Sequence, residues 1–201
     1  MTESKHEKLG LWLQWIGASA IGGFVFAVLA RRVSMAAGGT IGDSFGPVAA
    51  EVVIGALALG GIMVGIAAGQ WLVVRRSVAW AGWMVLAMVA GGMAGGATGF
   101  GVLQGLGGVD GGAFAVAVAV VAGLVALGGV GWLLLRGRAS AVGRFAWRSM
   151  AAVVAAVAAT GLSGIALGEY SGGGVGGAVF GAVYAGVTGF VVLPSAGGRS
   201  Q

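Results

Sequence analysis

The sequence predicts an all-α membrane protein in which six helices form one bundle. Hydrophobic residues make up 58% of the 201 residues and charged residues only 8%, whereas soluble domains carry about 25% charged residues. So few charges would not cover a soluble globule of this size, but lipid can solvate an apolar exterior. Six stretches have the length of about 20 residues that a membrane helix requires. Their apolar runs are continuous and lack the two-residue alternation of a barrel strand.

The predicted membrane helices are separated by short stretches rich in arginine, glycine or acidic residues. The helices are expected at residues 11–30, 48–74, 80–100, 113–135, 145–167 and 174–193, with tails at 1–10 and 194–201. The breaks are Arg31 to Pro47, Arg75–Arg76, Gly107 to Gly112, Arg136 to Arg144 and Glu169 to Gly173. The first stretch follows two lysines, as a signal peptide does. Its apolar run exceeds the usual length of about 7–15 residues, so we expect a retained helix.

The distribution of basic residues predicts that both tails are cytoplasmic, because lysine and arginine are enriched in cytoplasmic loops. With six crossings, nine basic residues fall inside and only Arg31 and Arg32 outside. Three explanations are open for these two arginines. They contact anionic lipids, they form ion pairs with Asp43 or Glu51, or the first stretch does not cross the membrane. All seven tryptophans then lie at cytoplasmic helix ends, in keeping with the preference of tryptophan for the membrane interface. The residues expected at this interface are Trp71, Arg75, Arg76, Trp80, Trp83, Trp132, Arg136 and Trp147.

Three of the predicted helices end alike, which indicates an internal repeat. Residues 69–75, 131–136 and 189–194 each begin with glycine, continue with an aromatic residue and three aliphatic residues, and end at a basic residue or proline. In the first stretch Gln70 stands between the glycine and the aromatic residue. The alternate helices begin with tryptophan at Trp12, Trp80 and Trp147. We expect three related hairpins, made of helices six and one, two and three, and four and five, with approximate threefold symmetry about the membrane normal. The alternative is that many helices leave a membrane with an aromatic residue followed by a basic one.

The stretch Gly69-Gln70-Trp71-Leu72-Val73-Val74-Arg75-Arg76, followed by Trp80 and Trp83, resembles a hairpin of uncharacterised multi-pass membrane proteins of bacteria. The resemblance covers residues 60–100 well. It covers residues 122–160 weakly, because Gly131 replaces the glutamine and Gly137 the second arginine. It implies a location in the bacterial inner membrane and carries no activity with it.

Small residues recur at every fourth position in several of the predicted helices. This spacing places them on one helical stripe, where backbones can approach closely in a glycine zipper. A water-filled path lined by the same glycines is the alternative. The residues expected at helix contacts are Gly61, Gly65, Gly69, Gly91, Gly95, Gly99, Gly164, Gly177, Gly181 and Gly189.

Three polar residues within the apolar stretches are candidates for burial: Glu51, Gln70 and Arg148. Ionisable groups at membrane depth are costly and are often functional, but Glu51 and Arg148 lie close enough to a helix end to reach water. Gln70 would need partners if buried, either on a neighbouring helix or on a ligand.

The residue content argues against an enzyme, a metal site and a cofactor. Cysteine is absent, and the single histidine, His6, lies in the N-terminal tail, so zinc and haem ligands are missing from the apolar stretches. A catalytic serine or carboxylate at membrane depth would lack its base. The basic residues cluster at helix ends, which does not favour nucleic-acid binding.

These observations leave three classes of function for a non-enzymatic membrane protein. The first is a structural or accessory subunit, or a scaffold, in a membrane complex with partner subunits. The second is a small transporter or a substrate-binding membrane subunit for an apolar or weakly polar solute. The third is a protein whose cytoplasmic ring of tryptophan and arginine binds anionic lipids of the bilayer.

Overall fold

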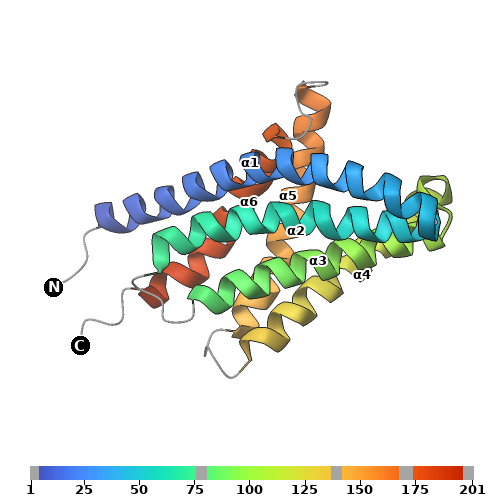
Figure 1. Ribbon diagram of the computed structural model, residues 1–201. Helices are drawn as coiled ribbons and strands as arrows, with labels where there is room; N and C mark the ends of the chain where they lie inside the picture. The colour runs from blue at the N-terminus through green and yellow to red at the C-terminus, as the bar shows by residue number, and fades with distance from the viewer. Residues whose placement is uncertain (1–4, 76–80, 137–141, 168–173, 197–201) are drawn as a thin grey trace.

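The computed structural model describes residues 5–75, 81–136, 142–167 and 174–196, and every regular element in these ranges is a helix (Figure 1). The all-α prediction is therefore confirmed for the described residues. The helices are α1 (Lys5–Phe45), α2 (Pro47–Val74), α3 (Ala81–Gly105), the 3-10 turn η1 (Gly108–Gly111), α4 (Gly112–Leu135), α5 (Val142–Leu167) and α6 (Gly174–Ala196).

The first helix does not end at Ala30, where the sequence analysis placed its end, but continues to Phe45. Two arginines mark a membrane boundary in a sequence, yet arginine is a good helix former and does not end a helix. The break falls instead at Gly46, whose φ of 89° is open to glycine but strained for other residues. Pro47 then begins α2, a position where its missing N–H costs nothing. The expected linker of residues 31–47 is thus reduced to one residue.

Helices α1 to α4 form a row of antiparallel neighbours, and α6 packs against α1 behind this row (Figure 1). Helix α5 crosses behind the row at a steep angle in this view, and its C-terminal end projects past α1. It contacts α6 and, over a shorter stretch, α4. The order of contacts around the bundle is therefore α4, α3, α2, α1, α6, α5, with α4 and α5 the most loosely joined neighbours.

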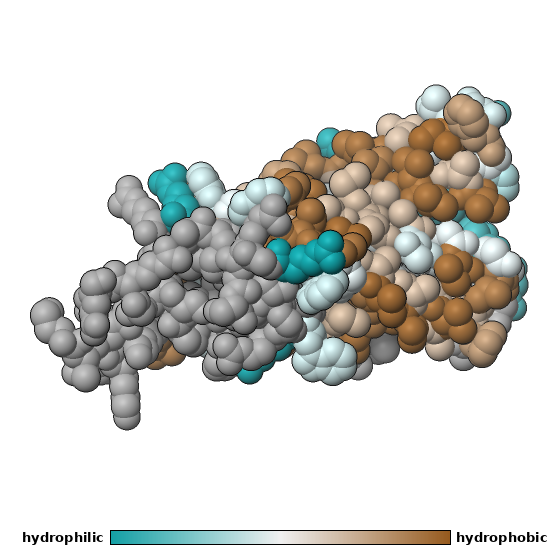
Figure 2. Space-filling model, turned by 90° about the horizontal axis from the view of Figure 1, so that it is seen from below, coloured by the Kyte–Doolittle hydropathy of each residue, from teal (hydrophilic) through white to brown (hydrophobic). Residues whose placement is uncertain are grey.

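Four helices are long and apolar enough to cross a membrane, which indicates a membrane protein. Their described apolar stretches are Leu9–Phe45, Pro47–Val74, Ala81–Gly105 and Ala117–Leu135. Helices α5 and α6 contribute shorter apolar stretches, Trp147–Thr160 and Gly174–Gly189. Figure 2 shows that hydrophobic residues cover most of the described part of the face seen from below.

Pairs of adjacent glycines let one helix approach two neighbours at once. A Cβ built on Gly22 would lie 2.5 Å from the carbonyl carbon of Gly65 in α2, and one on Gly23 would lie 3.0 Å from that of Gly177 in α6. Both distances are far shorter than an ordinary contact, so only glycine fits. Successive residues point about 100° apart around a helix, which is why the two members of a pair face different helices.

Helix α3 contains two such pairs of adjacent glycines, and each pair faces two neighbouring helices. Gly95 faces α4, where its Cβ would lie 2.9 Å from the carbonyl oxygen of Gly123, while Gly96 faces α2, where its Cβ would lie 2.6 Å from the carbonyl carbon of Gly55. The Gly91–Gly92 pair repeats this division one turn earlier. The spacing of four predicted contacts at Gly91, Gly95 and Gly99, but it did not predict the contacts of Gly92 and Gly96, which lie on a second stripe of α3.

The remaining glycines expected at contacts lie against α1 or on α5. Gly61 faces Ala30, and Gly69 faces Ala18, so these contacts between α1 and α2 extend over about three turns of α1. Gly181 faces Ser19 across the α1–α6 contact, and a Cβ on Gly189 would lie 3.2 Å from the rings of Trp12 and Trp15. Gly164 lies in α5, beyond the part of that helix whose side chains are described.

The three helix pairs of the expected repeat differ in their packing. The α2–α3 and α1–α6 pairs have glycine contacts along much of their length. The α4–α5 pair meets mainly where Gly128 faces the Met150 side chain. Threefold symmetry among these pairs therefore stays a prediction.

Candidate functional site

An apolar groove with a volume of about 550 Å³ lies between α2, α3, α4 and α5. It exists because α4 and α5 separate beyond the contact of Gly128 with Met150. Its lining includes Ala58, Phe100 and Val157, and none of the residues that line it has a polar side chain. A groove of this character can hold an apolar ligand by burial of apolar surface but offers no directed hydrogen bond from a side chain.

The groove lies in the middle and in one half of the bundle. Its α3 wall runs from Gly95 to Leu103, near the C-terminal end of that helix, and its α4 wall runs from Ala119 to Leu127. Leu103 lies close to the η1 turn, whereas Leu127 is 15 residues from the first residue of α4 and eight from the last. The groove therefore extends from the η1 side past the middle of α4 toward the end that carries Trp132.

The part of the bundle outside the groove has a core with several polar groups. Gln70 is completely buried, and neither its amide nitrogen nor its amide oxygen has a hydrogen-bond partner among the described residues. Trp15 is also completely buried, and its indole Nε1 likewise has no partner there. The neighbouring residues Gly69 and Ala18 are in close contact, so the helical turns that carry Gln70 and Trp15 lie beside one another.

The hydroxyl groups in this core satisfy themselves locally or with one another. Ser19 donates to the carbonyl of Trp15 at 2.8 Å, and Thr188 donates to that of Tyr184 at 2.9 Å. Each bond runs to the fourth residue before, the usual way for a hydroxyl to be satisfied inside an apolar helix. The sequence analysis expected a hydrogen-bond partner or a ligand for Gln70, and the described residues supply no partner.

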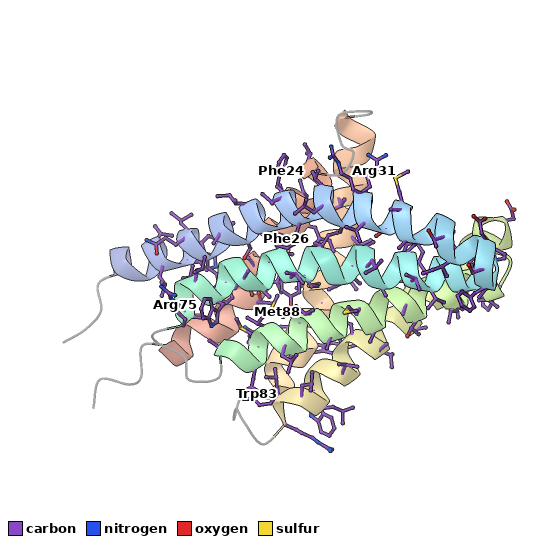
Figure 3. All side chains as sticks on the ribbon, in the orientation of Figure 1. Phe24, Phe26, Arg31, Arg75, Trp83 and Met88 are labelled. Atoms are coloured by element: carbon purple, nitrogen blue, oxygen red, sulfur yellow. The ribbon has the colours of Figure 1, made fainter. Side chains whose placement is uncertain are left out.

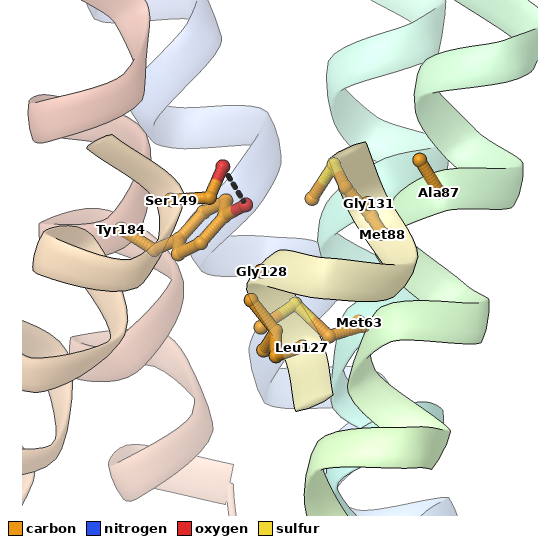
Figure 4. Close-up of a pocket in the computed structure, with 8 residues that line it drawn as sticks. All are labelled: Met63, Ala87, Met88, Leu127, Gly128, Gly131, Ser149 and Tyr184. Atoms are coloured by element: carbon orange, nitrogen blue, oxygen red, sulfur yellow. Dashed lines mark hydrogen bonds between the residues drawn. The ribbon is translucent and has the colours of Figure 1, made fainter. Parts of the chain in front are cut away.

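A buried hydrogen bond joins α5 to α6 (Figure 4). The hydroxyl of Tyr184, in α6, donates to Oγ of Ser149, in α5, over 3.1 Å. Both residues line a small cavity of about 20 Å³ together with apolar residues of α2, α3 and α4, among them Met63 and Leu127. A cavity of this size has room for about one water molecule, and the two hydroxyls give that water polar partners.

The tryptophan-rich ends carry the same contact on two helices. The guanidinium carbon of Arg75 lies 5.2 Å from the ring centre of Trp71, and that of Arg136 lies 5.4 Å from the ring centre of Trp132. An arginine within about 6 Å of an indole face is attracted by the ring electrons. Trp83 and Trp147 are also exposed, as expected of interfacial residues. Arg76 and Trp80 lie outside the described residues.

Of the three polar candidates from the sequence, Gln70 alone is buried, since Glu51 and Arg148 are half-buried. Glu51 lies in the first turns of α2 and Arg148 in the first turns of α5. The described residues contain no group of three or more His, Asp or Glu side chains that would hold a metal ion.

Arg31 and Arg32 lie elsewhere, on the exposed surface of α1. In Figure 3 the side chains of Arg31 and Phe24 extend from α1 on the side away from α2. Ala30, the residue before them, faces Gly61, which is 14 residues from the first and 13 from the last residue of α2. The arginines are therefore level with the middle of α2. The sequence analysis expected them beyond the end of a membrane helix, and the uninterrupted α1 places them within its length.

The comparisons with known proteins assign no family. No protein-family model matches the chain, and neither a curated protein nor a solved structure shows significant similarity to it.

Proposed function

We propose that this chain is a non-enzymatic integral membrane protein that binds one apolar chain, such as a lipid acyl chain, in the groove between α2, α3, α4 and α5. The observation that carries the proposal is a hollow of about 550 Å³ without a polar lining side chain. This volume falls within the range of about 300–1,000 Å³ that is usual for ligand pockets. The ligand is held by apolar burial and by the shape of the walls.

The dimensions favour a chain over a partner helix as the occupant. One helical turn with its side chains, about 11 Å wide and 5.4 Å high, fills about 500 Å³. A membrane-spanning helix of about 20 residues has more than five such turns, so only a small part of it could enter the groove. A flexible acyl chain can follow the walls along their length.

The rest of the bundle supports binding over conduction. We propose that the close glycine contacts work as a glycine zipper, in which van der Waals contact between backbones holds the helices together. Contacts such as Gly22–Gly65 and Gly95–Gly123 leave no room for a side chain between the helices. A water-filled path along these stripes is disfavoured for that reason.

We further propose six crossings with both termini in the cytoplasm of a bacterial cell. The four long apolar helices and the two matching Trp–Arg contacts support this topology. Those contacts also favour the internal repeat, because Trp71 with Arg75 and Trp132 with Arg136 have the same spacing and geometry. Threefold symmetry of the whole bundle is the boldest part of this proposal.

A role as an accessory subunit of a membrane complex is the second candidate. The exposed face of α1, with two arginines level with the middle of α2, favours it. Binding of anionic lipids is the third candidate, favoured by the exposed arginines at the ends of α2 and α4.

Photochemical labelling tests the groove. The protein is placed in nanodiscs of phosphatidylcholine that contain a phospholipid with a diazirine on one acyl chain, and labelled peptides are identified by mass spectrometry. We expect labels to concentrate at groove residues such as Val157 and Val120, beyond their share of exposed surface. A diazirine fatty acid in place of the phospholipid distinguishes a free apolar acid from a lipid chain.

A matched pair of variants in α5 makes the test specific. Ala158 lines the groove, whereas Ala151 is equally assigned to the exposed class and does not line it. Ala158→Phe should reduce labelling of the groove several-fold, and Ala151→Phe should leave it unchanged. Labelling that follows surface exposure alone, in both variants as in the parent protein, would refute the proposal.

A further inference from the structure

The middle of α1 carries two arginines among exposed apolar side chains. Ile21, Phe24, Leu29, Val33 and Met35 are between 46% and 69% exposed on the same helix. Phe24, Arg31 and Met35 follow one another at spacings of seven and four, which places them on one face of the helix. The described residues provide no ion-pair partner for either arginine.

The depth of these arginines follows from the contact of Ala30 with Gly61. Gly61 lies about 20 Å from each end of α2, because 13 or 14 residues separate it from them. The hydrocarbon core of a bilayer is about 30 Å thick, so its middle is about 15 Å from either surface. If α2 is centred in the bilayer, Arg31 starts near the midplane.

An unpaired arginine facing lipid at this depth is costly. Transfer into the membrane centre costs about 2.5–3.5 kcal/mol for each arginine on insertion scales. Charged residues at such depth usually face a protein partner or a water-filled cavity. A carboxylate accepts two parallel hydrogen bonds from a guanidinium, and it is the side chain that best satisfies an arginine away from water.

A second copy of this chain does not supply that carboxylate from its described residues. Copies related by an axis along the membrane normal bring residues of equal depth together. The acidic residues whose side chains the structure describes are Asp43 near the end of α1, Glu51 near the start of α2 and Asp110 in η1. All three lie toward the opposite end of the bundle from the tryptophans, about 14 Å or more along the helix from the level of Ala30 and Gly61.

We propose that Arg31 and Arg32 form a docking site for a membrane-spanning helix of a different protein that carries an aspartate or glutamate near its centre. The carboxylate pairs with the two guanidinium groups, and the apolar residues around them, such as Phe24 and Met35, pack against the partner helix. This site lies on α1, outside the residues that line the groove. It therefore stands or falls separately from the binding of an apolar chain.

Synthetic membrane-spanning peptides test this docking site. One leucine-rich helix carries a single glutamate at its centre, a second carries glutamine there, and a third carries the glutamate one turn from its end. Binding to the labelled full-length protein is measured by energy transfer in phosphatidylcholine vesicles. We expect the first peptide to bind at least tenfold more tightly than the other two.

Variants of the protein then assign this preference to the two arginines. The double variant Arg31→Leu with Arg32→Leu should abolish the tighter binding of the peptide with a central glutamate, and the two Lys substitutions should retain part of it. Arg75→Leu, at the end of α2, should leave this tighter binding unchanged. The leucine variant should fold, because it removes charge from a lipid-facing surface. The single variants Arg31→Leu and Arg32→Leu repeat the measurement if the double variant is poorly produced.

Three results would overturn the proposal. One is equal binding of the glutamate and glutamine peptides. Another is loss of the preference when phosphatidylglycerol is added to the vesicles, which would assign the arginines to lipid phosphates. The third is equal loss of thermal stability, without any peptide, in Arg31→Leu and in Glu169→Gln, a residue outside the described ranges, which would assign them to an ion pair within the chain.

Discussion

Replacing Gly22 by alanine should push α1 and α2 apart, because the added methyl would lie 2.5 Å from the carbonyl carbon of Gly65. Ordinary contact begins at 3.4 Å, and the carbonyl oxygen of Gly65 is nearer still than its carbon, so the two backbones must separate by at least about 0.9 Å unless one helix rotates. A gap of about 0.5–1 Å forfeits a quarter to a half of the dispersion energy of each affected contact. Overpacking of a tight site costs about 1–3 kcal/mol.

The matched control is Gly17→Ala in the same helix, where a Cβ meets no atom within 4 Å. Alanine stabilises a helix interior by about 0.5–1 kcal/mol relative to glycine, and both variants receive this gain. The free energy of unfolding should therefore fall for Gly22→Ala relative to Gly17→Ala by about 1–3 kcal/mol. Gly181→Ala and Gly186→Ala form a second such pair in α6, since only the former faces a backbone, at Ser19.

Reversible unfolding by titration of sodium dodecyl sulfate into dodecylmaltoside micelles, followed by tryptophan fluorescence, gives these free energies. Because both variants of a pair gain the same helix propensity, the difference between their free energies of unfolding reports the effect of the helix contact alone. Equal stability of Gly22→Ala and Gly17→Ala, repeated in the α6 pair, would refute the view that these glycines hold the bundle together.

Three further predictions concern the core and the topology. Gln70→Leu should raise the free energy of unfolding by about 1–3 kcal/mol, because it removes a buried amide without a described partner; a loss of stability would reveal a bound water or ligand there. Tyr184→Phe and Ser149→Ala should each cost about 0.5–1.5 kcal/mol, and the double variant should cost less than their sum because the two share one hydrogen bond. A cysteine at Ser44 should react with a membrane-impermeant maleimide from outside the cell and one at Ser77 only after lysis; the reverse pattern would invert the proposed orientation.

The helical class follows from composition and continuous apolar length, but the end of the first helix does not. The arginines at 31 and 32 look like a boundary in the sequence because charge is disfavoured in lipid. Helix formation depends instead on the backbone, and the sequence from Val33 to Phe45 contains nothing that stops it before Gly46 and Pro47. The distinction between a membrane boundary and a helix end cannot be read from charge alone.

The glycine pattern predicts contact faces without predicting their partners. A spacing of four identifies a stripe on one helix, whereas the second member of a pair such as Gly95–Gly96 lies on a second stripe that meets another helix. The adjacent pairs were visible in the sequence and are the signal that would have revealed two contacts for one helix. Which neighbour each stripe meets depends on tertiary structure.

The candidate groove has no counterpart in the sequence pattern. Its residues are alanine, glycine and aliphatic side chains like those of the packed helix faces. The groove arises because α5 meets α4 at Gly128 and α6 through Ser149, and diverges from α4 on one side of that point. Likewise, sequence analysis placed Trp15 with the interfacial tryptophans, and contacts from α2 and α6 bury it completely.

The two halves of the bundle differ in a way that limits what the groove can hold. Leu127 lines both the apolar groove and the small cavity beside Tyr184 and Ser149, so it stands between the two hollows. An apolar chain that enters from the η1 side meets Leu127 15 residues, or about 22 Å, along α4 from Gly112. On the other side of Leu127 lies the separate cavity of about 20 Å³, whose two hydroxyl groups are hydrogen-bonded to one another. An apolar terminus therefore fits against Leu127, whereas continuation toward the tryptophan-rich ends would require the chain to break the Tyr184–Ser149 hydrogen bond without replacing it. Leu127 and this bond lie between the groove and the small cavity, which favours a site that holds a chain over a path that carries one across the membrane.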